Sequence, residues 1–240
     1  MALVVGSIWF SDTILLNVFL LFTCLGIYEY ATLLKEKNIN LSFFFYVVAI
    51  CLYLLPYCQH YQFGKMNFLL ATALSLIAIL FIVELFRKQE NPFAVIAYSV
   101  LGLIWIVLPF SLVNILPIYF GKQAKYLLLM FFILVWANDT LAYCAGSLFG
   151  KHKLFERISP KKTWEGTLIS AVLTMLLACF LPKIFALNLT IVQMLIFSAI
   201  IIVIGTLGDL TESLFKRSLD VKDSGNILPG HGGILDRFDS

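Results

Sequence analysis

Long apolar runs, each about as long as a membrane-crossing helix, limit the possible folds of this chain more than any other feature. A helix needs roughly 20 residues to span the hydrocarbon core of a bilayer. Apolar residues make up 61% of the 240 residues, against about 45–50% in typical soluble proteins. A soluble fold could not bury them, so we predict an integral membrane protein. Seven runs qualify as spans: 13–34, 41–58, 68–86, 93–118, 126–149, 167–187 and 189–208.

The spans are expected to be α-helices. Only helices and closed barrels satisfy every backbone polar group within lipid, and barrel strands alternate apolar and polar residues. Residues 195–204 (LIFSAIIIVI) show no alternation. We predict an all-α, multi-pass membrane protein with seven to eight transmembrane helices, in which Pro109 and Pro117 leave the end of the fourth span undefined. Residues 1–240 are expected to form one membrane-embedded domain whose polar segments are 150–166 and 208–240.

The distribution of positive charge predicts the orientation. Loops 35–40, 87–91, 150–166 and 209–240 carry 13 of the 17 Lys and Arg residues, and the alternate loops carry four. Cytoplasmic loops are enriched in Lys and Arg. We therefore expect a cytoplasmic C-terminus and a polar site that faces the cytoplasm.

Charge is concentrated in the last segment, 208–240. Carboxylates are ligands that Mg²⁺ prefers, cations bind phosphate oxygens, and a Pro-Gly-x-Gly-Gly turn lets backbone N–H groups approach an anion. The alternative is a solvated tail of mixed charge. The segment contains Asp209, Glu212, Lys216, Arg217, Asp220, Lys222, Asp223, Gly225, Gly230, His231, Gly232, Gly233, Asp236, Arg237 and Asp239.

Spacing within this segment predicts shared helix faces. If a helix continues through 209–219, Asp209, Glu212 and Lys216 lie on one face. Asp236 and Asp239, three residues apart, would share another. Simple salt bridges are the alternative, and Glu212 with Lys216 has favourable i, i+4 spacing.

The other polar segment, 150–166, contains Lys161 and Lys162 within the sequence ISPKKTWEG. Ser159-Pro160 indicates a turn, and Thr163 or Ser159 could cap the next helix. The two lysines could serve substrate binding, or they could be only a signal of topology.

Three carboxylates lie inside or at the ends of apolar spans. Asp139, in WANDTLAY, is expected to be either functional or a buried hydrogen-bonding group between helices. Glu29 and Glu84 are weaker candidates near the cytoplasmic ends of their spans, and Glu84 can pair with Arg87 or Lys88.

Several common chemistries lack their motifs. The sequence contains no GxxxxGK[ST], GxSxG or HExxH, which argues against a P-loop ATPase, a serine hydrolase and a zinc protease. The five cysteines form no CxxC pair, so neither a zinc site nor a disulfide framework is indicated.

The polar motifs together resemble those of the phosphatidate cytidylyltransferases, also called CDP-diacylglycerol synthases. The matching residues are Ser213-x-Phe215-Lys216-Arg217, Lys222-Asp223-Ser224-Gly225, Pro229-Gly230-His231-Gly232-Gly233, and Leu235-Asp236-Arg237-x-Asp239-Ser240. SPKKTWEG and the Asn138-Asp139 region also look similar. The motifs cover about the last hundred residues. Family members usually have a fuller first helix and a further apolar helix after the last motif, so we expect this sequence to be shortened at both ends.

The resemblance implies transfer of CMP from CTP to phosphatidic acid, giving CDP-diacylglycerol and pyrophosphate, with Mg²⁺ and a second, monovalent cation such as K⁺. It implies metal binding by Asp209, Asp236 and Asp239, with Asp223 nearby. It also implies phosphate or substrate binding by Lys161, Lys162, Lys216, Arg217, Lys222, His231, Gly232, Gly233 and Arg237.

The resemblance also predicts the setting of the enzyme. We expect it in a bacterial inner membrane, in contact with lipid and without a nucleic-acid partner, and a homodimer is one possible assembly. Two alternatives stay open: a CTP-dependent transferase or kinase acting on another lipid, and a secondary transporter of an organic anion that uses Asp139. A transporter would place its charges near the membrane midplane, whereas these cluster at one end of the spans.

Overall fold

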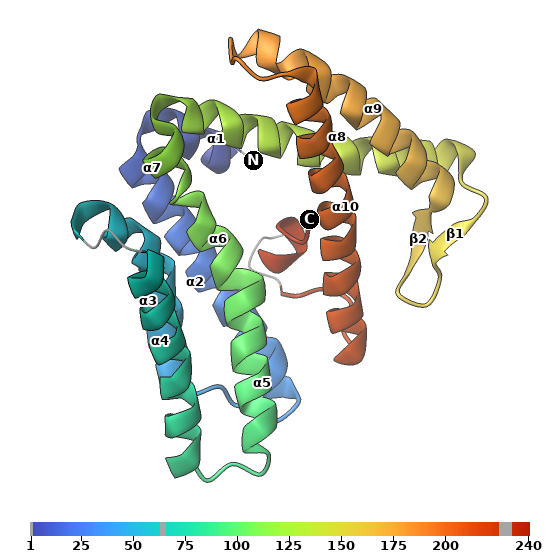
Figure 1. Cartoon of the computed structure of the whole chain (residues 1–240). Coiled ribbons are helices and arrows are strands. Elements are labelled where there is room, and N and C mark those ends of the chain that lie inside the picture. Colours follow the sequence, from blue (N-terminus) through green and yellow to red (C-terminus); the bar gives the residue numbers. More distant parts are fainter. Residues whose placement is uncertain (1, 63–65, 226–231) are drawn as a thin grey trace. The chain divides into compact units, whose positions relative to one another are not determined.

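A computed structural model describes residues 2–62, 66–225 and 232–240, with the backbone only of residues 2, 58–62 and 66–69. Helices dominate its regular structure (Figure 1). The helices are α1 (Ala2–Phe10), α2 (Asp12–Glu36), α3 (Phe43–Gln62), α4 (Met66–Phe86), α5 (Pro92–Gly102), η1 (Leu103–Val107), α6 (Leu108–Val113), α7 (Leu116–Phe120), η2 (Gly121–Gln123), α8 (Ala124–Phe149), α9 (Trp164–Ile184), α10 (Ile191–Ser218) and η3 (Leu235–Arg237).

The helices confirm a multi-pass integral membrane protein. Within the described ranges, four helical stretches are long and apolar enough to cross a membrane, and two shorter apolar helices accompany them. The expected number of seven to eight spans is therefore not confirmed. The four long stretches are Asp12–Glu36, Pro92–Phe149, Trp164–Ile184 and Ile191–Ser218.

Two prolines of the fourth span each occupy the second position of a helix. A π-helical turn, η1, directly precedes α6, whose second residue is Pro109. The chain then breaks briefly before α7, whose second residue is Pro117. Proline lacks the N–H that would complete the helical ladder, so both residues lie at the start of a new helix.

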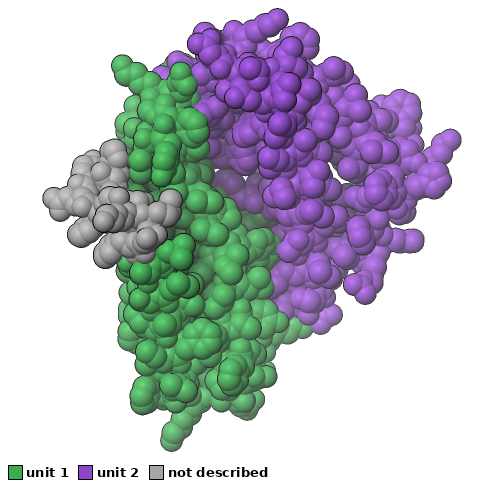
Figure 2. Space-filling model, viewed as in Figure 1, with its two compact units in different colours: residues 1–124, 224–235 green, residues 125–223, 236–240 purple. Residues whose placement is uncertain are grey.

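The described chain forms two compact units (Figure 2). Unit 1 contains Met1–Ala124 and Ser224–Leu235, and unit 2 contains Lys125–Asp223 and Asp236–Ser240. The C-terminal polar segment thus contributes residues to both units.

The core of unit 1 includes buried residues of both α2 and α3. Two of its fully buried residues are Tyr30 and Tyr53. Their hydroxyls donate to backbone oxygens, Tyr30 to Tyr98 O (2.8 Å) and Tyr53 to Leu16 O (2.7 Å). Buried aromatic rings thereby fill the core without leaving an unpaired hydroxyl.

Unit 2 is built from α8, α9 and α10. Glycine allows α8 and α9 to approach closely, since a Cβ on Gly166 would lie 2.8 Å from Ala142 O and 2.9 Å from Gly146 Cα. Small residues permit such packing between membrane helices. The core of the unit consists of Met130, Leu134, Ala178, Leu181, Met194 and Ile201.

A short antiparallel hairpin between α8 and α9 departs from the all-α prediction. It pairs β1 (Lys153–Phe155) with β2 (Ser159–Thr163). Ser159-Pro160, predicted as a turn, instead begins β2, a position where proline is tolerated. Thr163, rather than Ser159, caps α9 by accepting from Gly166 N at 3.2 Å.

Candidate functional site

The polar end of α10 forms an ion-pair group in unit 2. The helix continues to Ser218, so Asp209, Glu212 and Lys216 share one face as predicted. Lys216 Nζ lies 2.6 Å from Glu212 Oε2 and 2.7 Å from Asp236 Oδ1. The exposed fractions of these side chains are 13% for Lys216, 2% for Glu212 and 11% for Asp236. Lys216, expected to bind phosphate, is held here between two carboxylates.

A second ion pair joins the two polar segments. Lys162 Nζ, on β2, contacts Asp209 Oδ2, on α10, and each side chain is about one-quarter exposed. Ser213 Oγ, one turn further along α10, lies 3.5 Å from Asp209 Oδ1. The sequence predicted Lys162 and Asp209 as site residues, and the structure brings these two into contact.

Asp139, Asp239 and Ser240 form a neighbouring group. Ser240 Oγ lies 3.2 Å from Asp139 Oδ2 and 3.2 Å from Asp239 Oδ1, and its single proton can be donated to only one of them at a time. Burial and the carboxylates of Asp209 and Asp139 raise the pKa of Asp239 to about 6. Asp139, Asp209 and Asp239 therefore lie within electrostatic reach of one another. We name these three residues the aspartate cluster.

Two glycines of α10 allow the last residues to lie against the helix. A Cβ on Gly208 would be 2.5 Å from Asp239 O, and one on Gly205 would be 3.2 Å from Ser240 O. Any larger residue at 208 would displace the backbone that carries Asp239.

The prediction that Asp236 and Asp239 share a helix face is wrong. The 3₁₀ helix η3 ends at Arg237, and Asp239 lies outside it. The two aspartates instead have different surroundings, since Asp236 pairs with Lys216 while Asp239 belongs to the aspartate cluster.

The base of the hairpin is fixed where it meets α9. Glu165 accepts hydrogen bonds from Lys151 N (3.0 Å) and His152 N (3.1 Å), and His152 Nδ1 is 2.6 Å from its other oxygen. Trp164 N donates to His152 O at 2.9 Å. These bonds anchor the hairpin strand that carries Lys161, which is exposed, and Lys162.

The remaining predicted phosphate and metal ligands of unit 2 are on its surface. Arg217, Lys222, Asp223 and Arg237 are all exposed. Arg217 Nη1 lies 3.5 Å from Val221 O. The structure does not connect these side chains to the Lys162–Asp209 pair.

Unit 1 holds Gly232 and Gly233 of the Pro-Gly-His-Gly-Gly motif, and there sequence analysis underestimated Glu29. Ser224, Ile234 and Leu235 all donate hydrogen bonds to the Glu29 carboxylate, and Gly233 packs against it. Gly232 has φ +79°, a conformation that favours glycine. Pro229, Gly230 and His231 lie outside the described residues. An acidic residue within an apolar helix was the only sequence signal for Glu29.

Carboxylate oxygens of the predicted type are available for a divalent cation. Burial, followed by the charges of Asp209 and Asp139, raises the pKa of Asp239, and a bound cation would neutralise part of the negative charge of these carboxylates. The predicted set of Asp209, Asp236 and Asp239 is divided between the aspartate cluster and the Lys216 group. Within the residues that the structure describes, no three His, Cys, Asp or Glu side chains come close enough to hold a metal ion as they stand.

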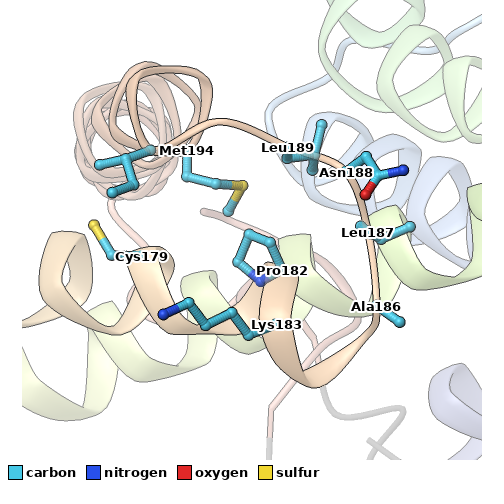
Figure 3. A pocket seen from close by; sticks show the side chains of 9 residues that line it. Cys179, Pro182, Lys183, Ala186, Leu187, Asn188, Leu189 and Met194 are labelled. Atoms are coloured by element: carbon cyan, nitrogen blue, oxygen red, sulfur yellow. The ribbon is translucent and has the colours of Figure 1, made fainter.

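A cavity of about 290 Å³ lies at the other end of α10 (Figure 3). Met194 lines it, 15 residues before Asp209 and hence about 22 Å away along the helix. Its walls are mainly apolar, with Lys183 as the cation among them. The cavity is therefore separate from the polar groups described above.

Comparison with known proteins gives a consistent set of relatives. A sequence model of the cytidylyltransferase family matches residues 1–240. A phosphatidate cytidylyltransferase of Bacillus subtilis (strain 168) is 34% identical over 220 residues, covering 90% of this chain and 80% of that protein. One from Staphylococcus haemolyticus (strain JCSC1435) is 34% identical over 233 residues, covering 96% and 86%. One from Haemophilus influenzae is 48% identical over 120 residues, covering 48% and 41%.

Proposed function

The chain belongs to the cytidylyltransferase family, and we propose that it transfers CMP from CTP to phosphatidic acid in phospholipid biosynthesis. The observation that carries this proposal is the ion pair between Lys162 and Asp209. It joins the two polar segments, each of which contributes a motif typical of the family.

The transfer step brings two anions together. An oxygen of the phosphatidic acid phosphate attacks the α-phosphorus of CTP, a new P–O bond forms, and the bond to the β-phosphate breaks. Pyrophosphate leaves with the bonding electron pair, and CDP-diacylglycerol results. The attacking phosphate monoester is largely ionised near pH 7, since its second pKa is about 6, so no strong general base is required.

The chain's own residues have to position the reactants and neutralise their charge. Such effects supply most of the catalysis in phosphoryl transfer. We assign phosphate binding to Lys162 and the exposed Lys161, with further cations from Arg217, Lys222 and Arg237. Because Lys216 forms short ion pairs with both Glu212 and Asp236, we assign it to hold Asp236 beside Glu212.

We assign Mg²⁺ binding to Asp209 and Asp239, with Asp139 as a third carboxylate and Asp236 nearby. Bound Mg²⁺ would orient the phosphates and stabilise charge on the leaving pyrophosphate. A monovalent cation such as K⁺ is proposed as a second ion. Lys162 neutralises part of the charge of Asp209 in the structure.

The proposed setting is the inner membrane of a bacterium, with the C-terminus in the cytoplasm, where CTP is available. An exposed residue after α10, Lys222, offers a test of this orientation. A Lys222→Cys variant without the five native cysteines should react with an impermeant thiol reagent in inside-out vesicles and not in intact cells. The opposite pattern would overturn the orientation.

The activity is tested with membranes that contain the protein, radiolabelled phosphatidic acid and CTP. We expect labelled CDP-diacylglycerol and release of pyrophosphate, both dependent on Mg²⁺. Product formed only from a polyprenol or another lipid alcohol would refute the substrate assignment. Uptake of an organic anion without any CTP-dependent product would instead favour a transporter.

A further inference from the structure

The carboxylate of Glu29 is buried in the middle of α2, and the side chain is 3% exposed. A carboxylate within a membrane helix is costly unless it has partners. Its partners therefore indicate why it is there.

The partners come from both ends of one stretch of the C-terminal segment, all within unit 1. Ile234 N donates to Oε1 at 2.8 Å and Leu235 N donates to Oε2 at 3.0 Å. Ser224 Oγ, at the other end of the stretch, lies 3.4 Å from Oε2. A charged acceptor makes such bonds stronger than neutral ones.

The residues beside these donors leave space for the carboxylate. A Cβ on Gly225 would lie 3.1 Å from Glu29 Oε1, and one on Gly233 would lie 2.5 Å from Oε2 and closer still to Ser224 Oγ. On the same face of α2, one turn earlier, a Cβ on Gly26 would be 3.5 Å from Leu235 Cδ2. The backbone at Gly225 and Gly233 is thus fitted closely around a single side chain.

We propose that Glu29 is a positioning residue for the transfer reaction: it holds Ser224, and the backbone at Ile234 and Leu235, by accepting their hydrogen bonds. This role rests on the proposed function. Leu235, held through its backbone N–H, is the first residue of η3, which continues directly into Asp236 and Arg237. Glu29 would act through these residues without touching a substrate.

The test is Glu29→Gln, which keeps the shape of the side chain but replaces one accepting oxygen with a donating NH₂. Hydrogen exchange of the protein in lipid nanodiscs would be followed in peptides that contain Ile234 and Leu235. We expect these amides to exchange roughly tenfold to a hundredfold faster, the factor expected for losing a hydrogen bond to a charged acceptor. Unchanged exchange would overturn the proposal.

Glu84→Gln is the matched control. Glu84 is also a buried glutamate of unit 1, but its partner is Arg87 Nη1 at 2.6 Å. We expect this variant to leave exchange at Ile234 and Leu235 unchanged. A loss of protection there equal to that in Glu29→Gln would contradict a specific role for Glu29.

A second variant covers the case in which Glu29→Gln loosens all of unit 1. Gly233→Ala leaves α2 unaltered and pushes the carboxylate away from the segment. Faster exchange at Ile234 and Leu235, with normal exchange in α2 and α3, would support the proposal, and normal exchange at both amides would refute it.

Activity measurements separate this proposal from the proposed function. If the wild-type protein makes no CDP-diacylglycerol, the proposed function fails while the exchange data still decide whether Glu29 holds the segment. If the wild type is active, turnover should fall at least tenfold in Glu29→Gln. Normal turnover together with faster exchange would refute a positioning role.

Discussion

Glu29 in unit 1 and the aspartate cluster in unit 2 show two ways of accommodating carboxylates in an apolar protein. Glu29 is almost fully buried and accepts hydrogen bonds from backbone N–H groups and a serine hydroxyl. In the described part of unit 2, three aspartates share the ammonium group of Lys162, the hydroxyls of Ser213 and Ser240, and the backbone N–H of Ser240.

The different partners of these carboxylates suit different roles, one structural and one chemical. Hydrogen bonds from neutral donors stabilise the buried carboxylate of Glu29, and they also fix the residues that donate them. Burial and closely placed like charges both raise the pKa of a carboxyl group, as at Asp239, and such groups gain from binding a cation. In the proposed mechanism, Glu29 of unit 1 therefore has a positioning role, and unit 2 supplies carboxylates and cations that we assign to metal and phosphate.

The largest expected effect is on the aspartate cluster. Asp209→Asn should lower the rate of CDP-diacylglycerol formation about a thousandfold, because lost electrostatic stabilisation of a transition state costs 10²–10³ or more. The assay is initial rate at saturating Mg²⁺ and CTP. Asp12→Asn, at the exposed start of α2, is the control and should change the rate less than twofold. A rate in Asp209→Asn equal to that of the control would refute the metal assignment.

A smaller loss of activity is expected for Lys162, the cation that contacts Asp209 of the aspartate cluster. Lys162→Gln removes both the ion pair with Asp209 and a phosphate ligand, and kcat/KM for CTP should fall by about a hundredfold, or roughly 2.7 kcal/mol. Lys153→Gln, on the neighbouring strand β1, is the matched control. Equal losses in both variants would mean that only the net charge of the hairpin matters.

Lys216 offers a test of stability rather than rate. Lys216→Met leaves Glu212 and Asp236 without their shared cation, and breaking a buried pair in this way costs roughly 3–5 kcal/mol. The midpoint of thermal unfolding in detergent should fall clearly. Adding Glu212→Gln to Lys216→Met should recover part of that loss. If the single variant unfolds at the wild-type temperature, the pair contributes no stability.

Local signals in the sequence predicted much of the fold. Apolar runs located the helices, Thr163 caps α9, and α10 continues far enough to place Asp209, Glu212 and Lys216 on one face. These features depend on residues a few positions apart. The β-hairpin was missed because its two short strands carry no apolar alternation, and Pro160 favoured a turn.

The role of Glu29 could not be predicted in the same way. Its partners lie 195 to 206 residues further along the chain, and two of them are backbone N–H groups, which nearly every residue has. The cluster around Asp239 was likewise missed because i, i+3 spacing predicts a shared face only where a helix persists. Here η3 ends before Asp239, and the chain turns toward α10 and Asp139.

The smallest expected effect concerns how closely the last residues approach α10. Gly208→Ala places a methyl group 2.5 Å from Asp239 O, so the backbone has to shift and the aspartate cluster has to open. We expect a roughly tenfold lower rate with little change in thermal stability, because a displacement of about 1 Å near reacting groups can cost up to 10²-fold. Gly205→Ala, whose methyl group would lie 3.2 Å from Ser240 O, is the graded control and should lose less. If both variants keep the wild-type rate, the position of Asp239 does not limit catalysis. Asp239 would then have to be removed from the proposed Mg²⁺ ligands.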